Sequence, residues 1–145
     1  VEGNVGRRCY HPQDSGEVEA RVLLEIPGES PLVVKAFHQP WSLCCDGEPR
    51  QQLSARRRVT RDHPDLFALI LALDFDAACV LQRWVVGTTP TQDQFGDFWR
   101  EIQAVGIAHQ LIDVRPDNCI LVRDARRVVC VDFAVRDPAA ILAEA

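Results

Sequence analysis

Three oxygen-bearing side chains lie at the ends of apolar, strand-like runs in the stretch LIDVRPDNCILVRDARRVVCVDFA, residues 111–134. Asp113 is followed five residues later by Asn118, and Asp132 comes near the end of the second apolar run. An aspartate at the end of a buried strand must be solvated, paired or bound to a cation, because burying an isolated carboxylate is too costly. These three residues are therefore the leading candidates for chemistry.

Their order and spacing fit the layout that phosphoryl transfer needs. One carboxylate must orient the attacking hydroxyl, and oxygen ligands must hold Mg²⁺, a hard cation. We expect Asp113 to face the acceptor hydroxyl. We expect Asn118, at the head of a β-hairpin, and Asp132, after its return strand, to bind the metal.

The elements that must position these residues follow from local patterns. Alternating and apolar runs predict strands, helical spacing before Gly106 predicts an amphipathic helix that contains Phe95 and Trp99, and Asp137-Pro138 predicts the start of a helix. The run 50–59 has helix formers but a weak apolar stripe, so we expect an exposed surface helix. The predicted strands are 17–26, 31–37, 66–76, 78–86, 118–122 and 128–133, and the predicted final helix is 137–145.

Lys35 is the only lysine among the sixteen basic residues of the chain. It lies in the apolar run LVVKAF. In a chain so rich in arginine, a single lysine in a strand favours a position where a compact ammonium is needed and a planar guanidinium does not fit. The alternative is a lysine whose stem is buried and whose ammonium reaches solvent at a strand edge.

Taken together, the motifs resemble those of the protein-kinase-like superfamily over roughly residues 16–136. IDVRPDNCIL stands where that family has H-R-D-L-K-P-E-N-I-L, and DFA stands where it has D-F-G. The resemblance implies that Lys35 contacts the α- and β-phosphates of ATP, that Arg115 takes the place of the catalytic-loop lysine, and that Gly16 and Val18 take the last Gly and Val places of the glycine-rich loop. The chain is also similar to divergent fungal kinase-like proteins.

This resemblance implies a kinase-like two-lobe α+β fold, with a small antiparallel sheet lobe at 1–86 and a shortened helical lobe at 90–145. It implies an ATP- and Mg-dependent phosphotransferase that acts on a protein Ser or Thr hydroxyl. Two alternatives are a pseudokinase that binds nucleotide or acts as a scaffold, and a small-molecule phosphotransferase.

Departures from the family pattern favour the pseudokinase. No intact G-x-G-x-x-G precedes the first predicted hairpin, and the predicted helix lacks the usual glutamate partner of the lysine. Glu48 lies too early, and Gln52 is the remaining candidate. The complete set of Lys35, Asp113, Asn118 and Asp132 favours an enzyme.

Composition limits the other classes of function. The 145 residues suffice for one domain with a real core, and a net charge of -5 argues against a general nucleic-acid-binding surface. Arg56, Arg57, Arg58 and Arg61 are the residue types that bind phosphate or nucleic acid, but the acidic total favours a solvated helix face. No apolar run is long enough for a membrane span and no signal peptide opens the chain, so we expect an intracellular, cytoplasmic protein without a membrane partner.

Six cysteines show no C-x2-C spacing, so we expect them to be small buried hydrophobic residues rather than zinc ligands or disulfides. The start at Val1 and the lack of methionine lead us to expect that the natural N-terminus lies upstream.

Overall fold

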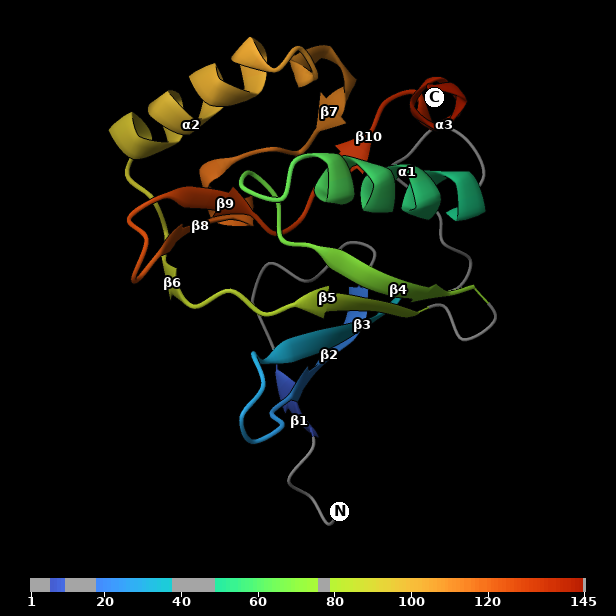
Figure 1. Ribbon diagram of the computed structural model, residues 1–145, viewed down its shortest axis with the longest axis vertical. Helices are drawn as coiled ribbons and strands as arrows, with labels where there is room; N and C mark the ends of the chain where they lie inside the picture. The colour runs from blue at the N-terminus through green and yellow to red at the C-terminus, as the bar shows by residue number, and fades with distance from the viewer. Residues whose placement is uncertain (1–5, 10–17, 38–48, 76–78, 145) are drawn as a thin grey trace. The chain divides into compact units, whose positions relative to one another are not determined.

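The computed structural model describes residues 6–9, 18–37, 49–75 and 79–144. The chain forms two compact units that alternate along the sequence (Figure 1). The first unit comprises 1–44 and 69–84, and the second comprises 45–68 and 85–145. The sequence placed one boundary between 86 and 90, whereas the structure groups helix α1 (Pro49–Asp62) with the C-terminal half.

The first unit is built on a five-stranded antiparallel sheet with the order β1-β2-β3-β5-β4. A turn at Gly28, whose φ is 81°, joins β2 to β3 as the sequence predicts, and the Glu29 amide donates to the Ile26 carbonyl at 3.0 Å. The five strands are β1 (Gly6–Cys9), β2 (Val18–Leu24), β3 (Leu32–Phe37), β4 (Ile70–Asp74) and β5 (Cys79–Arg83).

The second unit contains α1, α2 (Gln92–Ala104) and α3 (Pro138–Ala143) with two small antiparallel sheets. Figure 1 shows α1 beside α3 and β10. One sheet has the order β6-β8-β9, and the other pairs β7 with β10. Their strands are β6 (Gly87–Thr88), β7 (Leu111–Ile112), β8 (Cys119–Val122), β9 (Val128–Cys130) and β10 (Ala134–Val135). Two 3-10 turns, η1 (Ala108–Gln110) and η2 (Pro116–Asn118), flank β7 and β8.

These elements confirm a mixed α+β fold with small antiparallel sheets. Several of the observed strands are shorter than the sequence predicts. The strand expected over 66–76 begins at Ile70, because Phe67 packs its ring 4.7 Å from that of Phe133 and forms a parallel bridge with Cys130 in the second unit. The strand expected over 128–133 ends at Cys130, and the chain then forms β10.

Helix α2 begins and ends as its local sequence dictates. Thr91 is the N-cap and forms a capping box with Gln94, and Gly106 just beyond the helix has a φ of 82°. Phe98 and Ile102 are buried on its inner face. Helix α3 begins after Asp137, whose carboxylate accepts from the Ala140 amide at 3.3 Å, as the sequence also predicts.

Helix α1 is not the exposed surface helix that we expected. Its buried face combines Leu53, Ala55 and Val59 with polar residues that the apolar stripe could not reveal. Gln52, Arg56 and Thr60 are also buried, so Arg56 does not belong to a solvated arginine face, although Arg57 and Arg61 are exposed. Polar side chains can be buried in this way because hydrogen bonds inside the protein replace those to water.

The core of the second unit is formed by side chains from all three of these helices and from the short strands between them. Its members include Val59, Phe67, Phe98, Ile102, Cys119, Cys130, Phe133, Val135 and Ile141. Cys119 and Cys130 are free thiols in this core, as the sequence predicts, and Cys79 is partly buried. Within the described part of the chain, no helix has the length and apolar character needed to span a membrane.

Candidate functional site

The end of the β8–β9 hairpin brings two of the predicted metal ligands together. The register pairs Cys119 with Cys130, and the next residues outward are joined by a hydrogen bond from the Val131 amide to the Asn118 carbonyl at 2.9 Å. Asp132 follows Val131 directly. Asn118 and Asp132 are therefore held at the same end of the hairpin, and both side chains are partly exposed.

Asp113 is tied to this hairpin end through the side chain of Asn118. The Asn118 Nδ2 group donates to the Asp113 carbonyl at 2.8 Å. Asp113 has a φ of 63°, a left-handed conformation that aspartate tolerates better than most residues. Its carboxylate is on an exposed residue that immediately follows β7.

The second antiparallel pair places Asp113 near the segment that carries Asp132. In the β7–β10 pair, Ile112 lies opposite Ala134. Continued by one residue, that register puts Asp113 opposite Phe133, the residue after Asp132. Two independent strand pairings thus bring Asp113, Asn118 and Asp132 into one neighbourhood of the second unit.

Arg115 lies in the loop between Asp113 and Asn118, and its backbone is part of the site. Its carbonyl accepts from the Asn118 amide at 2.9 Å, which closes η2. Its guanidinium lies 3.6 Å from the Asp117 carboxylate, and 60% of the Arg115 side chain is exposed. An exposed ion pair of this kind contributes little to stability, so Arg115 can exchange it for a ligand at small cost.

The orientation of Asn118 suits a metal ligand. Because Asn118 donates to the Asp113 carbonyl through Nδ2, its amide oxygen takes no part in that hydrogen bond and lies on the other side of the amide group. Mg²⁺ is usually bound through one or two protein oxygen ligands together with substrate phosphates. Within the described residues, no group of three or more His, Cys, Asp or Glu side chains could hold a metal, so a cation here would depend on Asn118, Asp132 and ligand oxygens.

The lysine that we expected to contact phosphates lies in the first unit. Lys35 is on β3, the middle strand of the five, and is only 6% exposed. Its Cα partners are Arg21 on β2 and Val80 on β5. It is therefore not a surface lysine at a sheet edge.

The two residues assigned to the glycine-rich loop are described only in part. Val18 begins β2 and pairs with Phe37, and an irregularity in the register follows before Ala20. Gly16 lies outside the described residues, as does Glu48.

Gln52 has a structural role that sequence reasoning missed. Its Nε2 donates to the Val135 carbonyl at 2.8 Å, and its Oε1 accepts from the Val135 amide at 2.7 Å and from Arg56 Nε at 3.0 Å. Since two donors occupy both lone pairs of Oε1, Gln52 is not the partner of the lysine that we considered. One sequence feature could have indicated this buried polar face: the four-residue spacing of Gln52, Arg56 and Thr60 places them on the same side of a helix.

The buried thiol of Cys130 supports the backbone at Asp132. Its Sγ donates to the Asp132 carbonyl at 3.1 Å. Burial raises the pKa of Cys130 well above that of an ordinary thiol, and a hydrogen bond with Cys119 raises it further. Cys130 is therefore a neutral donor that holds the turn after β9.

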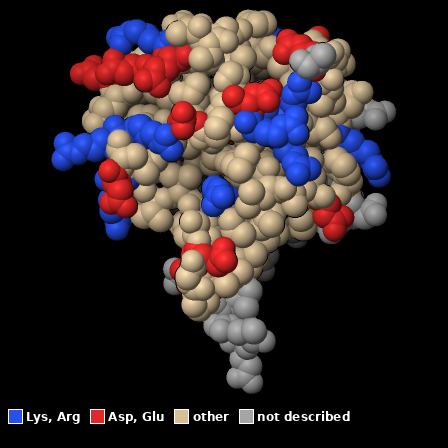
Figure 2. All heavy atoms as spheres, viewed as in Figure 1, with Lys and Arg blue, Asp and Glu red and all other residues tan. Residues whose placement is uncertain are grey.

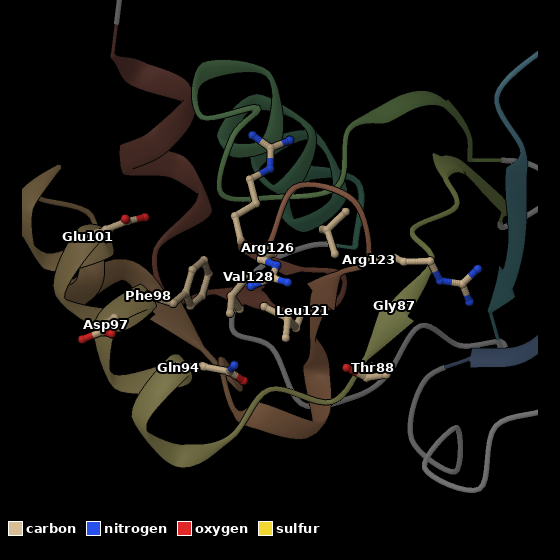
Figure 3. Close-up of a pocket in the computed structure, with 12 residues that line it drawn as sticks. Gly87, Thr88, Gln94, Asp97, Phe98, Glu101, Leu121, Arg123, Arg126 and Val128 are labelled. Atoms are coloured by element: carbon tan, nitrogen blue, oxygen red, sulfur yellow. The ribbon is translucent and has the colours of Figure 1, made fainter.

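A separate cavity of about 600 Å³ lies in the second unit between α2 and the β6–β8–β9 sheet (Figure 3). Phe98 points from α2 toward Leu121 and Val128, and polar lining residues include Gln94 and Arg126. Asp113, Arg115, Asn118 and Asp132 do not line it. We therefore distinguish this cavity from the candidate site.

Charged side chains of both signs are interspersed over the described surface that Figure 2 shows. This distribution agrees with the modest net charge of -5. Comparison of the sequence with protein-family models and with curated proteins finds no match.

Proposed function

We propose that this protein is a kinase-like phosphotransferase that transfers the γ-phosphoryl group of Mg-ATP to a hydroxyl, with a protein Ser or Thr as the leading acceptor. The observation that carries the proposal is the joint placement of Asn118 and Asp132 at one hairpin end, with Asn118 bonded to the Asp113 backbone. These are the residue types that phosphoryl transfer requires, in the order that it requires.

Each residue has a separate role in this proposal. Mg-ATP, when bound, supplies the phosphoryl group and the cation that neutralises its charge. Asn118 and Asp132 hold the cation through oxygen atoms, and Asp113 orients the acceptor hydroxyl and accepts its proton. Lys35 contacts the phosphates, and the guanidinium of Arg115 offers further positive charge to the transferred group.

A pseudokinase is the second candidate, and one observation favours it. The described helix α1 has Asp62 as its only carboxylate, and Asp62 pairs with Arg58 at 3.2 Å. Gln52, the other candidate partner for Lys35, has its amide oxygen fully used. A site that binds nucleotide without turnover would need fewer of the active-site groups.

Thermal melts with ATP alone, with Mg²⁺ alone and with both test the nucleotide binding that the two candidate functions share. ATP at 100 times its dissociation constant should add about 2.7 kcal/mol to the free energy of unfolding. We expect Asp132→Asn to abolish the Mg-dependent part, Lys35→Met to weaken it and Asp113→Asn to preserve it. Asp124→Asn is the matched control, because Asp124 is an exposed carboxylate in the β8–β9 turn and has no assigned role at the site.

The melts are read together with an assay for labelled phosphate transfer. Stabilisation by Mg-ATP with transfer that Asp113→Asn abolishes supports the enzyme, and stabilisation without transfer to protein or small-molecule hydroxyls supports the pseudokinase. If neither ATP nor Mg-ATP raises the melting temperature of the unsubstituted chain, the nucleotide-binding proposal is wrong.

A further inference from the structure

Two cysteines face each other directly across the β8–β9 hairpin. Cys119 and Cys130 are Cα partners in the antiparallel register. The neighbouring pair, Asn118 and Val131, is joined by a backbone hydrogen bond. Because hydrogen-bonded and non-hydrogen-bonded pairs alternate along an antiparallel ladder, Cys119 and Cys130 form a non-hydrogen-bonded pair, in which facing side chains come closest.

Backbone contacts on the opposite side of β9 confirm this alternation. The Cys130 amide donates to the Leu66 carbonyl at 2.9 Å, and the Cys130 carbonyl accepts from the Ala68 amide at 3.0 Å. Both backbone groups of Cys130 therefore point away from β8. Residues Cys119 and Cys130 are 3% and 0% exposed, and their thiols are neighbours in the core.

The spacing of such a pair suits a covalent bond. Cα atoms in a non-hydrogen-bonded pair are about 4.5 Å apart, and disulfides span Cα separations of roughly 4.4–6.8 Å. Facing Cβ atoms are about 4.5–5.5 Å apart in an antiparallel pair, whereas a disulfide needs about 3.5–4.5 Å. Closing the bond therefore requires a small inward movement of the two strands.

We propose that Cys119 and Cys130 form a redox modification site, at which a hydroperoxide converts the two thiols into a cross-strand disulfide. In the first step one sulfur attacks a peroxide oxygen, the O–O bond breaks, and an alcohol or water leaves with a proton, which gives a sulfenic acid. In the second step the other thiol attacks this sulfur, an S–S bond forms, and the hydroxyl leaves as water with that thiol's proton. The two sulfurs lose two electrons in total, and the peroxide gains them.

Burial in the closed hairpin determines the rate of this reaction. The oxidant reaches the sulfurs only when the hairpin opens locally, so oxidation is slower than at the partly exposed Cys79. A thiol reductant reverses the bond by the same route. The pair therefore differs from an accessible single cysteine in that its oxidation requires local opening and yields an intramolecular disulfide.

The disulfide also bears on the candidate site, and this second part rests on the proposed function. Cys119 directly follows Asn118, and Cys130 lies two residues before Asp132. Inward movement of the strands at this pair displaces both proposed metal ligands. It also removes the Cys130 thiol proton that the Asp132 carbonyl accepts. We expect oxidation to weaken Mg-ATP binding roughly tenfold, as losses of supporting contacts around metal ligands do.

Tryptic peptide mapping of the full chain tests the disulfide directly. Arg123, Arg126 and Arg127 lie between the two cysteines, so trypsin separates Cys119 and Cys130 into different peptides. After the reduced, folded protein is treated with hydrogen peroxide, we expect these peptides to be joined under non-reducing conditions and released by dithiothreitol. Cys79→Ser is the control, and it should leave the link intact.

Two results would overturn the modification site. The first is that the peptides with Cys119 and Cys130 stay separate and keep free thiols after Cys79 has been fully oxidised. The second is that Cys119 and Cys130 are recovered in disulfides with other cysteines. Cys119→Ala should prevent the link, but the map of the unsubstituted chain decides the question even if this variant does not fold.

Thermal melts of the reduced and oxidised protein with Mg-ATP test the effect on the site. We expect Mg-ATP to stabilise the oxidised protein less than the reduced protein, and dithiothreitol to restore the full stabilisation. In Cys119→Ala, peroxide treatment should not change the stabilisation by Mg-ATP. If the link forms and the stabilisation does not change, the coupling to the metal ligands is wrong. If the reduced protein shows no stabilisation by Mg-ATP, the proposed function fails, while the peptide map still decides the disulfide.

Discussion

The side-chain amide of Gln52 pairs with both backbone hydrogen-bonding groups of Val135, a residue 83 positions further along the chain. The Gln52 amide therefore makes the same pair of hydrogen bonds to β10 that a residue of a neighbouring strand would make. Arg56 donates to the same amide oxygen, so one buried polar group of α1 organises the backbone that follows Asp132. This contact joins the helix to the segment that carries a proposed metal ligand.

We expect Gln52→Leu to lower the free energy of unfolding by about 2–4 kcal/mol, because it leaves the Val135 amide and carbonyl without partners in a buried place. Gln51→Leu is the matched control, since Gln51 is the exposed neighbour on the same helix and should change stability by less than about 0.5 kcal/mol. Urea unfolding curves of both variants measure the difference. Equal midpoints for the two variants would contradict the assigned role of Gln52.

Two glycines should respond in opposite directions to the same substitution. A Cβ at Gly87 would lie 1.9 Å from the Leu121 carbonyl oxygen, so Gly87→Ala should separate β6 from β8 and cost about 1–3 kcal/mol. A Cβ at Gly96 on α2 meets nothing within 4 Å, so Gly96→Ala should stabilise the protein by about 0.5–1 kcal/mol. Thermal unfolding shows both effects, and destabilisation by Gly96→Ala would count against the placement of α2.

Asn118→Asp separates the structural role of Asn118 from its proposed role at the metal. The carboxylate retains an oxygen ligand but cannot donate to the Asp113 carbonyl, so the protein without ligand should lose about 1–2 kcal/mol of stability. The loss should decrease at acid pH, where a protonated carboxyl can donate again. Melts with and without Mg-ATP should show retained metal dependence in Asn118→Asp and none in Asn118→Leu.

The N-terminal cap of α2 offers a test of local structure alone. The Thr91 hydroxyl accepts from the Gln94 amide at 3.2 Å, and the Gln94 side chain accepts from the Thr91 amide at 2.8 Å. We expect Thr91→Ala to cost about 1 kcal/mol, because the Gln94 amide loses its partner. Thr89→Ala, at an exposed position two residues earlier, should have little effect on the denaturation midpoint.

The sequence was most informative where structure depends on neighbouring residues. The N-terminal positions of α2 and α3, the turn at Gly28 and the β8–β9 hairpin all follow from signals within a few residues. The hairpin register in turn accounts for the placement of Asn118 near Asp132. A prediction of that part of the site needed only strand alternation and the position of the turn.

What the sequence could not provide depends on contacts between distant residues. Strands β6, β7 and β10 have two residues each, too few for a periodic pattern to emerge. The burial of α1 depends on Val135, which no local pattern connects with Gln52. The role of Lys35 remains a prediction, because it belongs to a different unit from Asp113, Asn118 and Asp132.

The alternation of the two units along the chain has a consequence for biosynthesis. Helix α1 leaves the ribosome well before the strand that satisfies its buried amide, because 83 residues separate Gln52 from Val135. At a translation rate of 5–20 residues per second, this interval corresponds to roughly 4–17 s. During that time the nascent helix exposes Leu53, Val59 and Gln52 to other chains, so the second unit should complete its folding only after Val135 emerges, and chaperone binding to the nascent chain should be concentrated in this interval.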